Sequence, residues 1–277
     1  MTTVSYDQLI QEADSLAPGL VRRTLFDRLK SIAPFLIGFA AFIWICIDVN
    51  LSPATFLSGL SKLGDFFGNM FPPSSGGQFP RTFNALIETL GMAFAGTFLG
   101  VVFAIPLGII GAKNVVSFGP LHFLIRRFFD FFRGIPALVW ALILVTAFGL
   151  GPFAGVIALA LADIPVLSKL YAEAIENVDR KPIEGLRAAG CGRFDVIRYG
   201  IAPQVTPIVL SQALYYLESN FRNAAILGVV GAGGIGFELE ERIRIFAFDE
   251  VAFIILLFMV AVAALDTISG HLREKLA

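Results

Sequence analysis

The sequence predicts an all-α membrane protein with about six transmembrane helices. Of its 277 residues, 56% are hydrophobic and only 16% are charged, and the mean hydropathy is +0.77. Because a soluble domain carries about 25% charged residues, this much apolar surface exceeds what one water-soluble core could bury. The apolar residues also form runs long enough to cross the roughly 30 Å hydrocarbon layer of a bilayer as helices.

Residues 1–31 are polar and carry acidic side chains ahead of the first apolar run, so we expect a cytoplasmic N-terminal segment and no signal peptide. Residues 32–277 are expected to form one transmembrane domain. Within it, residues 50–81 have the Pro, Gly and Ser content of a loop. The six apolar runs are Ile32–Val49, Ala85–Gly111, Ile135–Leu150, Phe153–Tyr171, Val205–Val230 and Val251–Ile268.

The distribution of basic residues predicts which side of the membrane each loop faces. Six spans place both termini on one side. Most of the 21 Lys and Arg residues lie in the N-terminal segment, in the second and fourth connections and after the last run. Cytoplasmic loops carry an excess of these residues, so both termini are expected in the cytoplasm. The second connection, residues 112–134, alternates cations with phenylalanines, which indicates contact with membrane lipid rather than with nucleic acid.

The fourth connection, at about residues 179–204, is the longest polar interruption in the second half of the chain. Its composition predicts one short helix over Ile183–Ala189 and a second over Arg193–Tyr199. Gly190 opens a glycine-rich break between them, and the Gly200–Pro203 segment is expected to stop the second helix. The pattern predicts a rigid polar hairpin between two membrane spans.

The fifth apolar run has a polar middle. A charge at bilayer depth costs at least about 2.5–3.5 kcal/mol, so it usually faces a bundle interior or a cavity. Two interpretations stay open: Glu218 and Arg222 pair across one helical turn, or Arg222 lines a path for an anion, because a guanidinium offers several donors to a phosphoryl group. The candidate pathway residues are Glu218, Ser219, Asn220, Arg222 and Asn223.

A glycine-rich segment follows the fifth run. It matches G-x-G-x-x-G literally, but a dinucleotide site needs a preceding strand within a soluble βαβ unit. Here the glycines are expected to let the backbone bend or pack closely, as a gate or hinge. They are Gly231, Gly233, Gly234 and Gly236. The sequence has no triphosphate-binding loop, catalytic set or metal cluster, so we expect neither an enzyme nor a cofactor or metal held by this chain.

Five residues of the hairpin resemble the EAA signature of permease subunits of ATP-binding-cassette importers, although Ala202 stands where that signature usually has Leu. They are Glu184, Ala188, Ala189, Gly190 and Pro203. Longer segments resemble the phosphonate permease subunit: GLGPFAGVIAL at 149–159, VLSKL at 166–170, ESNFRNA at 218–224 and VVGAGGIGFEL at 229–239.

This resemblance implies a type I importer permease in a bacterial inner membrane. It implies a second copy of the chain, two ATPase subunits that hold ATP and Mg, and a periplasmic phosphonate-binding protein. The EAA loop would couple the permease to the ATPase. The expected cargo is a phosphonate or a related phosphate or phosphite oxyanion. The alternatives are a permease for another small solute such as methionine, a membrane-embedded enzyme, and a secondary transporter that works alone.

Overall fold

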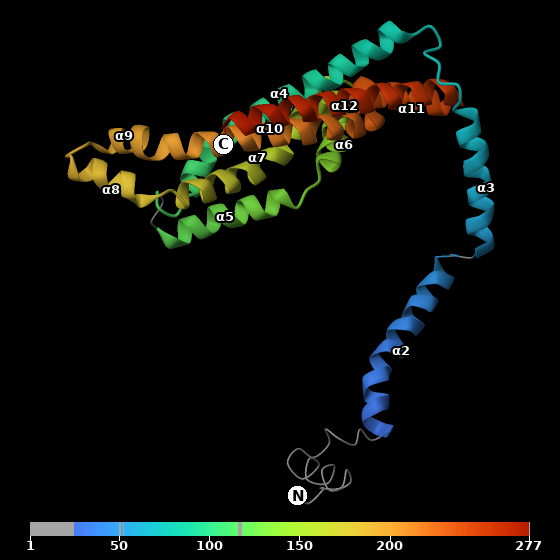
Figure 1. Cartoon of the computed structure of the whole chain (residues 1–277), viewed down its shortest axis with the longest axis horizontal. Coiled ribbons are helices and arrows are strands. Elements are labelled where there is room, and N and C mark those ends of the chain that lie inside the picture. The colour runs from blue at the N-terminus through green and yellow to red at the C-terminus, as the bar shows by residue number, and fades with distance from the viewer. Residues whose placement is uncertain (1–24, 50, 52, 116–117, 277) are drawn as a thin grey trace, which may run out of the picture. The chain divides into compact units, whose positions relative to one another are not determined.

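The computed structural model describes residues 25–49, 51, 53–115 and 118–276, and every regular element in these ranges is helical (Figure 1). The first 24 residues of the expected N-terminal segment lie outside the described residues. The chain divides into two compact units, residues 1–68 and 69–277. The functional features lie in the second unit.

The first unit contains helix α2 (Leu25–Asp48) and most of α3 (Pro53–Asn69). Helix α2 carries the first predicted span, and its apolar side chains are largely exposed, as expected of a lipid-facing segment. Helix α3 corrects the expectation of a loop over residues 50–81. Pro53 suits the first turn of a helix, and apolar residues then recur at helical spacing, which outweighs the loop composition.

The second unit is a bundle of helices with one long hairpin. Its elements are α4 (Phe79–Gly111), α5 (Gly119–Arg133), α6 (Ala137–Phe148), α7 (Pro152–Glu176), α8 (Arg180–Ala188), α9 (Arg193–Asp195), the π-helical turn η1 (Val196–Ile201), α10 (Ala202–Leu227), the kinked turn η2 (Gly228–Ala232), α11 (Gly234–Arg244) and α12 (Phe248–Leu276).

Three of the described helices, α4, α7 and α12, are long and apolar enough to cross a membrane. A fourth span arises if α5 and α6, which meet at a 78° bend, act together. The span expected over Ile135–Leu150 corresponds to α6, which has only 12 residues and is too short to cross a membrane alone, because Gly134 and Pro136 break the helix. Helix α10 is 26 residues long, but its polar middle lowers its hydropathy.

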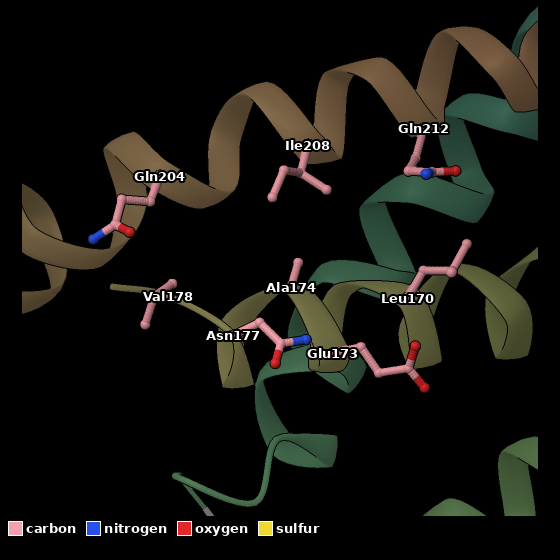
Figure 2. A pocket seen from close by; sticks show the side chains of 8 residues that line it. All are labelled: Leu170, Glu173, Ala174, Asn177, Val178, Gln204, Ile208 and Gln212. Atoms are coloured by element: carbon pink, nitrogen blue, oxygen red, sulfur yellow. The ribbon is translucent and has the colours of Figure 1, made fainter. Parts of the chain in front are cut away.

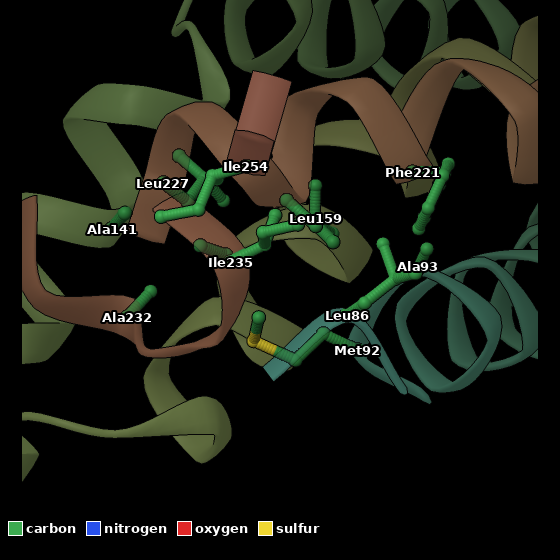
Figure 3. Packing of buried hydrophobic residues seen from close by; sticks show 12 residues of the cluster. Leu86, Met92, Ala93, Ala141, Leu159, Phe221, Leu227, Ala232, Ile235 and Ile254 are labelled. Carbon is green, nitrogen blue, oxygen red and sulfur yellow. The ribbon is translucent and has the colours of Figure 1, made fainter. Parts of the chain in front are cut away.

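Close packing between α4 and α7 forms the centre of the bundle. A Cβ on Gly96 would lie 2.8 Å from Leu159 Cβ, and a Cβ on Gly108 would lie 2.8 Å from Tyr171 Cβ. Small residues at these points let the two helices approach, as in other membrane bundles. The apolar core then extends to α10, α11 and α12, as Figure 3 shows for Phe221, Ile235 and Ile254 among others.

Candidate functional site

The first arm of the hairpin is helix α8, and both of its ends are capped. Asp179 accepts the backbone N–H of Lys181 at 3.0 Å. At the other end, the Cys191 N–H donates to the Leu186 carbonyl (3.1 Å), and the Gly190 N–H donates to the Arg187 carbonyl (3.0 Å). This is a Schellman motif, with Gly190 in the left-handed conformation at φ +81°. The predicted glycine elbow is confirmed.

The second arm does not stop at Gly200–Pro203, which corrects the sequence prediction. Helix α9, the turn η1 and α10 follow one another without a break from Arg193 to Leu227. The Ala202 N–H donates to the Ile197 carbonyl, five residues back. This wider turn accommodates the ring of Pro203, so the helix continues where a regular α-helix would have been interrupted. The second arm of the hairpin is therefore an extension of α10 itself.

The two arms of the hairpin are joined by packing and by one side chain that sequence analysis missed. A Cβ on Gly200 would lie 3.1 Å from Leu186 Cδ1, so this glycine permits close contact between the arms. Gln204 on α10 accepts the Asp179 N–H (2.8 Å) and donates to the carbonyls of Gly200 (2.6 Å) and Asp179 (3.3 Å). We call these three hydrogen bonds the Gln204 clasp.

The outer surface of the hairpin is exposed and partly apolar. Glu184, Ala188 and Ala189 are exposed, and Glu184 makes no hydrogen bond or ion pair with the described residues. The large side chains of Phe194, Ile197 and Tyr199 are 71%, 54% and 59% exposed. Exposed apolar side chains on a projecting polar hairpin are typical of a protein- or membrane-interaction surface.

A pocket of about 270 Å³ lies at the base of the hairpin, between α7 and α10 (Figure 2). Gln204 of the clasp lines it, as do Asn177, Gln212 and Glu173. Glu173 Oε1 is 3.2 Å from Arg126 Nη1 on α5. Apolar side chains complete the lining, so the pocket is largely apolar, and its one charged group is a carboxylate that does not attract anions.

The predicted pathway residues on α10 separate into two groups. Asn220 is 1% exposed and points into the bundle, where its Nδ2 donates to Thr97 Oγ1 (2.9 Å) and to Asp163 Oδ2. It thereby links α10 to α4 and α7. The sequence prediction grouped Asn220 with Arg222, but the two side chains contact different helices.

Arg222 forms an ion-pair network with α12. Its Nη2 is 3.1 Å from Glu218 Oε1, so the predicted pair across one helical turn is confirmed, and its Nη1 is 3.4 Å from Asp266 Oδ1. Arg273 adds a contact to Glu218 Oε2 at 3.0 Å. The Arg222 side chain nevertheless stays 43% exposed. Ser219 and Asn223 are half-buried and make no side-chain hydrogen bond within the described ranges.

The predicted gate glycines form a tight loop between α10 and α11. Gly231, Gly233 and Gly234 have φ values of +99°, +84° and +71°. Their conformation is held from α4, because Glu88 Oε1 accepts the Gly234 N–H at 3.1 Å. A Cβ on Gly236 would overlap the carbonyl of Ala225, so this fourth glycine permits the close approach of α11 to α10. A helix, and not a strand, precedes the loop, in agreement with rejection of the dinucleotide interpretation.

Residues 104–277 match the family described as the binding-protein-dependent transport system inner membrane component, and the chain belongs to this family. It is 37% identical over 246 residues to the phosphite transport system permease protein PtxC of Stutzerimonas stutzeri, covering 88% of this chain and 89% of that protein. It is also 33% identical over 267 residues to the phosphate-import permease protein PhnE of Mycolicibacterium smegmatis, covering 92% of this chain and 50% of that protein.

The fold also matches a solved importer structure. The MetNI methionine ABC transporter in an inward-facing conformation superposes with a TM-score of 0.62 and 20% identity, over 71% of this chain and 96% of the matched chain. At this identity the likeness shows the fold alone. The predicted type I importer fold is confirmed, and the chain is a multi-pass permease subunit of an ABC importer whose ATPase is a separate chain.

Proposed function

We propose that this chain forms the membrane pathway of an ATP-driven importer for a phosphonate or a related phosphite or phosphate oxyanion. The similarity to PtxC over most of both chains carries the proposal, because that relative is named for phosphite transport. The exposed guanidinium of Arg222 supports it, since the planar donors of arginine suit a phosphorus oxyanion. A second copy of the chain completes the pathway.

Arg222, Ser219 and Asn223 are the pathway residues that we propose, and Glu218 holds Arg222 in place. Two carboxylates, Glu218 and Asp266, already neutralise the guanidinium. To bind Arg222, an oxyanion must therefore displace one of these carboxylates from the guanidinium. This competition keeps the binding of the oxyanion weak enough for its release. Asn220 is not a pathway residue in this proposal, because its amide is buried between α4, α7 and α10.

The hairpin is the proposed coupling element. The exposed α8–η1 surface docks on one of two ATPase subunits, which bind ATP and Mg. Because the second arm is continuous with α10, movement of the hairpin moves the helix that carries Arg222. In this proposal the hairpin and both termini lie in the cytoplasm of a bacterial cell, and a periplasmic phosphonate-binding protein delivers cargo at the other side. The glycine loop before α11 is the proposed gate or hinge.

The test is ATP hydrolysis by the reconstituted complex, measured with its binding protein and one cargo at a time. The cargoes are 2-aminoethylphosphonate, phosphite, phosphate and methionine. We expect stimulation by phosphorus oxyanions only. Stimulation by methionine alone, or uptake by the chain without any ATPase, would contradict the proposal.

The role of Arg222 is tested in the same system. Arg222→Ala removes the oxyanion donors and leaves Glu218 with Arg273 only, so uptake is expected to fall at least about tenfold. Arg222→Lys keeps the charge but loses the planar donors, and its uptake should be intermediate. If both variants transport like the wild type, Arg222 is only a structural partner of Glu218.

A further inference from the structure

The turn between α11 and α12 places a residue other than glycine in the left-handed backbone conformation. Phe246 has φ +61°, a left-handed conformation that is unfavourable for an L residue. All other positive-φ residues in the described ranges are glycines. The Phe246 N–H donates to the Ile243 carbonyl and the Ala247 N–H to the Arg242 carbonyl, both at 3.1 Å, so Phe246 occupies the Schellman position that usually holds glycine.

The Phe246 side chain makes few contacts with the described residues that could offset this backbone strain. It is 76% exposed, and its neighbours Ile245 and Ile243 are 62% and 45% exposed. Among the described residues its ring contacts that of Phe248 in an edge-to-face arrangement, at 5.9 Å between centroids. We call Ile243, Ile245 and Phe246 the α11 tip. A strained residue that exposes a large apolar side chain is a functional hint.

The α11 tip stands on a rigid base. Arg242 is 4% exposed, and its Nε lies 2.6 Å from Glu250 Oε2 on α12. Glu238 is also buried and lies 2.8 Å from Arg81 on α4. A second contact joins Arg242 to Gln78, the residue before α4. These contacts tie the start of α4, α11 and the start of α12 together, so the tip is presented in one orientation.

The surroundings of the tip distinguish a protein partner from lipid. Arg244 and Arg81 are 77% and 49% exposed, and Glu241 is 39% exposed. A rim with both signs of charge around an aromatic centre is the anatomy of a protein–protein hot spot. Because Arg81 pairs with Glu238 and Glu241, and Arg244 pairs with Glu240, the rim offers paired charges of both signs and not the unpaired cluster of cations that attracts anionic lipid headgroups. The tip also lies at the end of the second unit away from α8 and α9 (Figure 1).

We infer that the α11 tip is a docking surface for the soluble binding protein of the importer, with Phe246 as its aromatic anchor. The inference rests on the proposed function, which places the hairpin in the cytoplasm and so the tip outside it. The family description requires a binding protein, and the tip is a rigid, apolar-centred surface at the end where that protein arrives.

Two substitutions at one position separate docking from folding. Phe246→Gly removes the ring and relieves the backbone, and Phe246→Ala removes the ring but keeps the strain. Both should raise the half-saturating concentration of binding protein for stimulated ATP hydrolysis by at least about tenfold, as loss of an interface anchor does. Their thermal stabilities should differ, with Phe246→Gly above Phe246→Ala by about 2–4 °C. Phe94→Ala, which removes a 62% exposed aromatic ring from the middle of α4, is the control.

The assay distinguishes this inference from the proposed function. Stimulation of the wild-type complex by binding protein and cargo tests the proposed function, and the ratio of each variant to the wild type tests docking. Unchanged half-saturating concentrations in both variants overturn the inference while the proposed function stands. A shift in the permease from dimer to monomer, with half-saturation unchanged, overturns it in favour of a contact between the two copies.

Discussion

Two helix ends, at opposite ends of the second unit, use the same backbone hydrogen bonds with different residues. Helix α8 ends in a Schellman motif with Gly190 at its left-handed position, and α11 ends in the same motif with Phe246 there. The α8 end packs through Leu186 against Gly200, and the Gln204 clasp lies at the opposite end of this helix, at Asp179, whereas the α11 end is tied down by buried ion pairs. At the end of α8, the preference of glycine for the left-handed conformation decides the turn. At the end of α11, contacts with other helices hold phenylalanine in that conformation against its local preference.

The largest effect on stability is expected at the α11 base. Arg242→Met leaves Glu250 without its cation and Glu238 with Arg81 only, so unfolding should become easier by about 3–5 kcal/mol. The matched control is Arg244→Met, because this 77% exposed arginine pairs with Glu240 at the surface and should cost only about 0–1 kcal/mol. Thermal unfolding of the purified permease measures both. Equal losses would mean that the ionic base does not anchor the tip.

The next effect is expected at the α8 end. Gly190→Val places a β-branched residue in the left-handed conformation and should abolish ATP-driven uptake while membrane insertion persists. Nothing lies within 4 Å of a Cβ at Gly190 or at Gly185, so space is equal at the two positions. Only the backbone differs.

An alanine pair therefore sharpens the comparison. Gly190→Ala should lower stability by about 1 kcal/mol because alanine strains the left-handed turn, and Gly185→Ala should raise it by about 0.5–1 kcal/mol because alanine favours the α8 helix. Urea unfolding of the two variants measures the difference. The same sign for both would show that the elbow conformation is not required.

Sequence reasoning was reliable where one segment decides its own structure. Run length was enough for α4, α7 and α12, and glycine chemistry was enough for the elbow at Gly190. Sequence reasoning failed where contacts with other segments of the chain, or an unusual helical turn, decide the structure. The direction of Asn220 depends on how α10 is rotated against α4 and α7, and no local pattern encodes that rotation. The helix continues past Pro203 because a π-helical turn precedes this residue, whereas the presence of proline alone predicts that the helix ends there.

The same reasoning explains why the Gln204 clasp was missed and what its loss should do. Glutamine is unremarkable in a helix, and only the folded hairpin brings it to Asp179, 25 positions earlier. Gln204→Leu removes three hydrogen bonds in a partly solvated place, so stability should fall by only about 1 kcal/mol. Because α8 is then tied less firmly to α10, cargo moved per ATP should fall several-fold while ATP hydrolysis continues.

Gln212→Leu is the matched control for the clasp. Gln212 lies on the same helix and lines the same pocket, but it makes no side-chain hydrogen bond with any residue that the structure describes (Figure 2). The Gln212→Leu variant should move as much cargo per ATP as the wild type. An equal fall in both variants would locate the effect in the pocket and not in the clasp. A fall in Gln204→Leu alone would mean that the start of α8 is coupled to α10 through the two neutral hydrogen bonds between Gln204 and Asp179, the counterpart of the ion pairs that hold the α11 end.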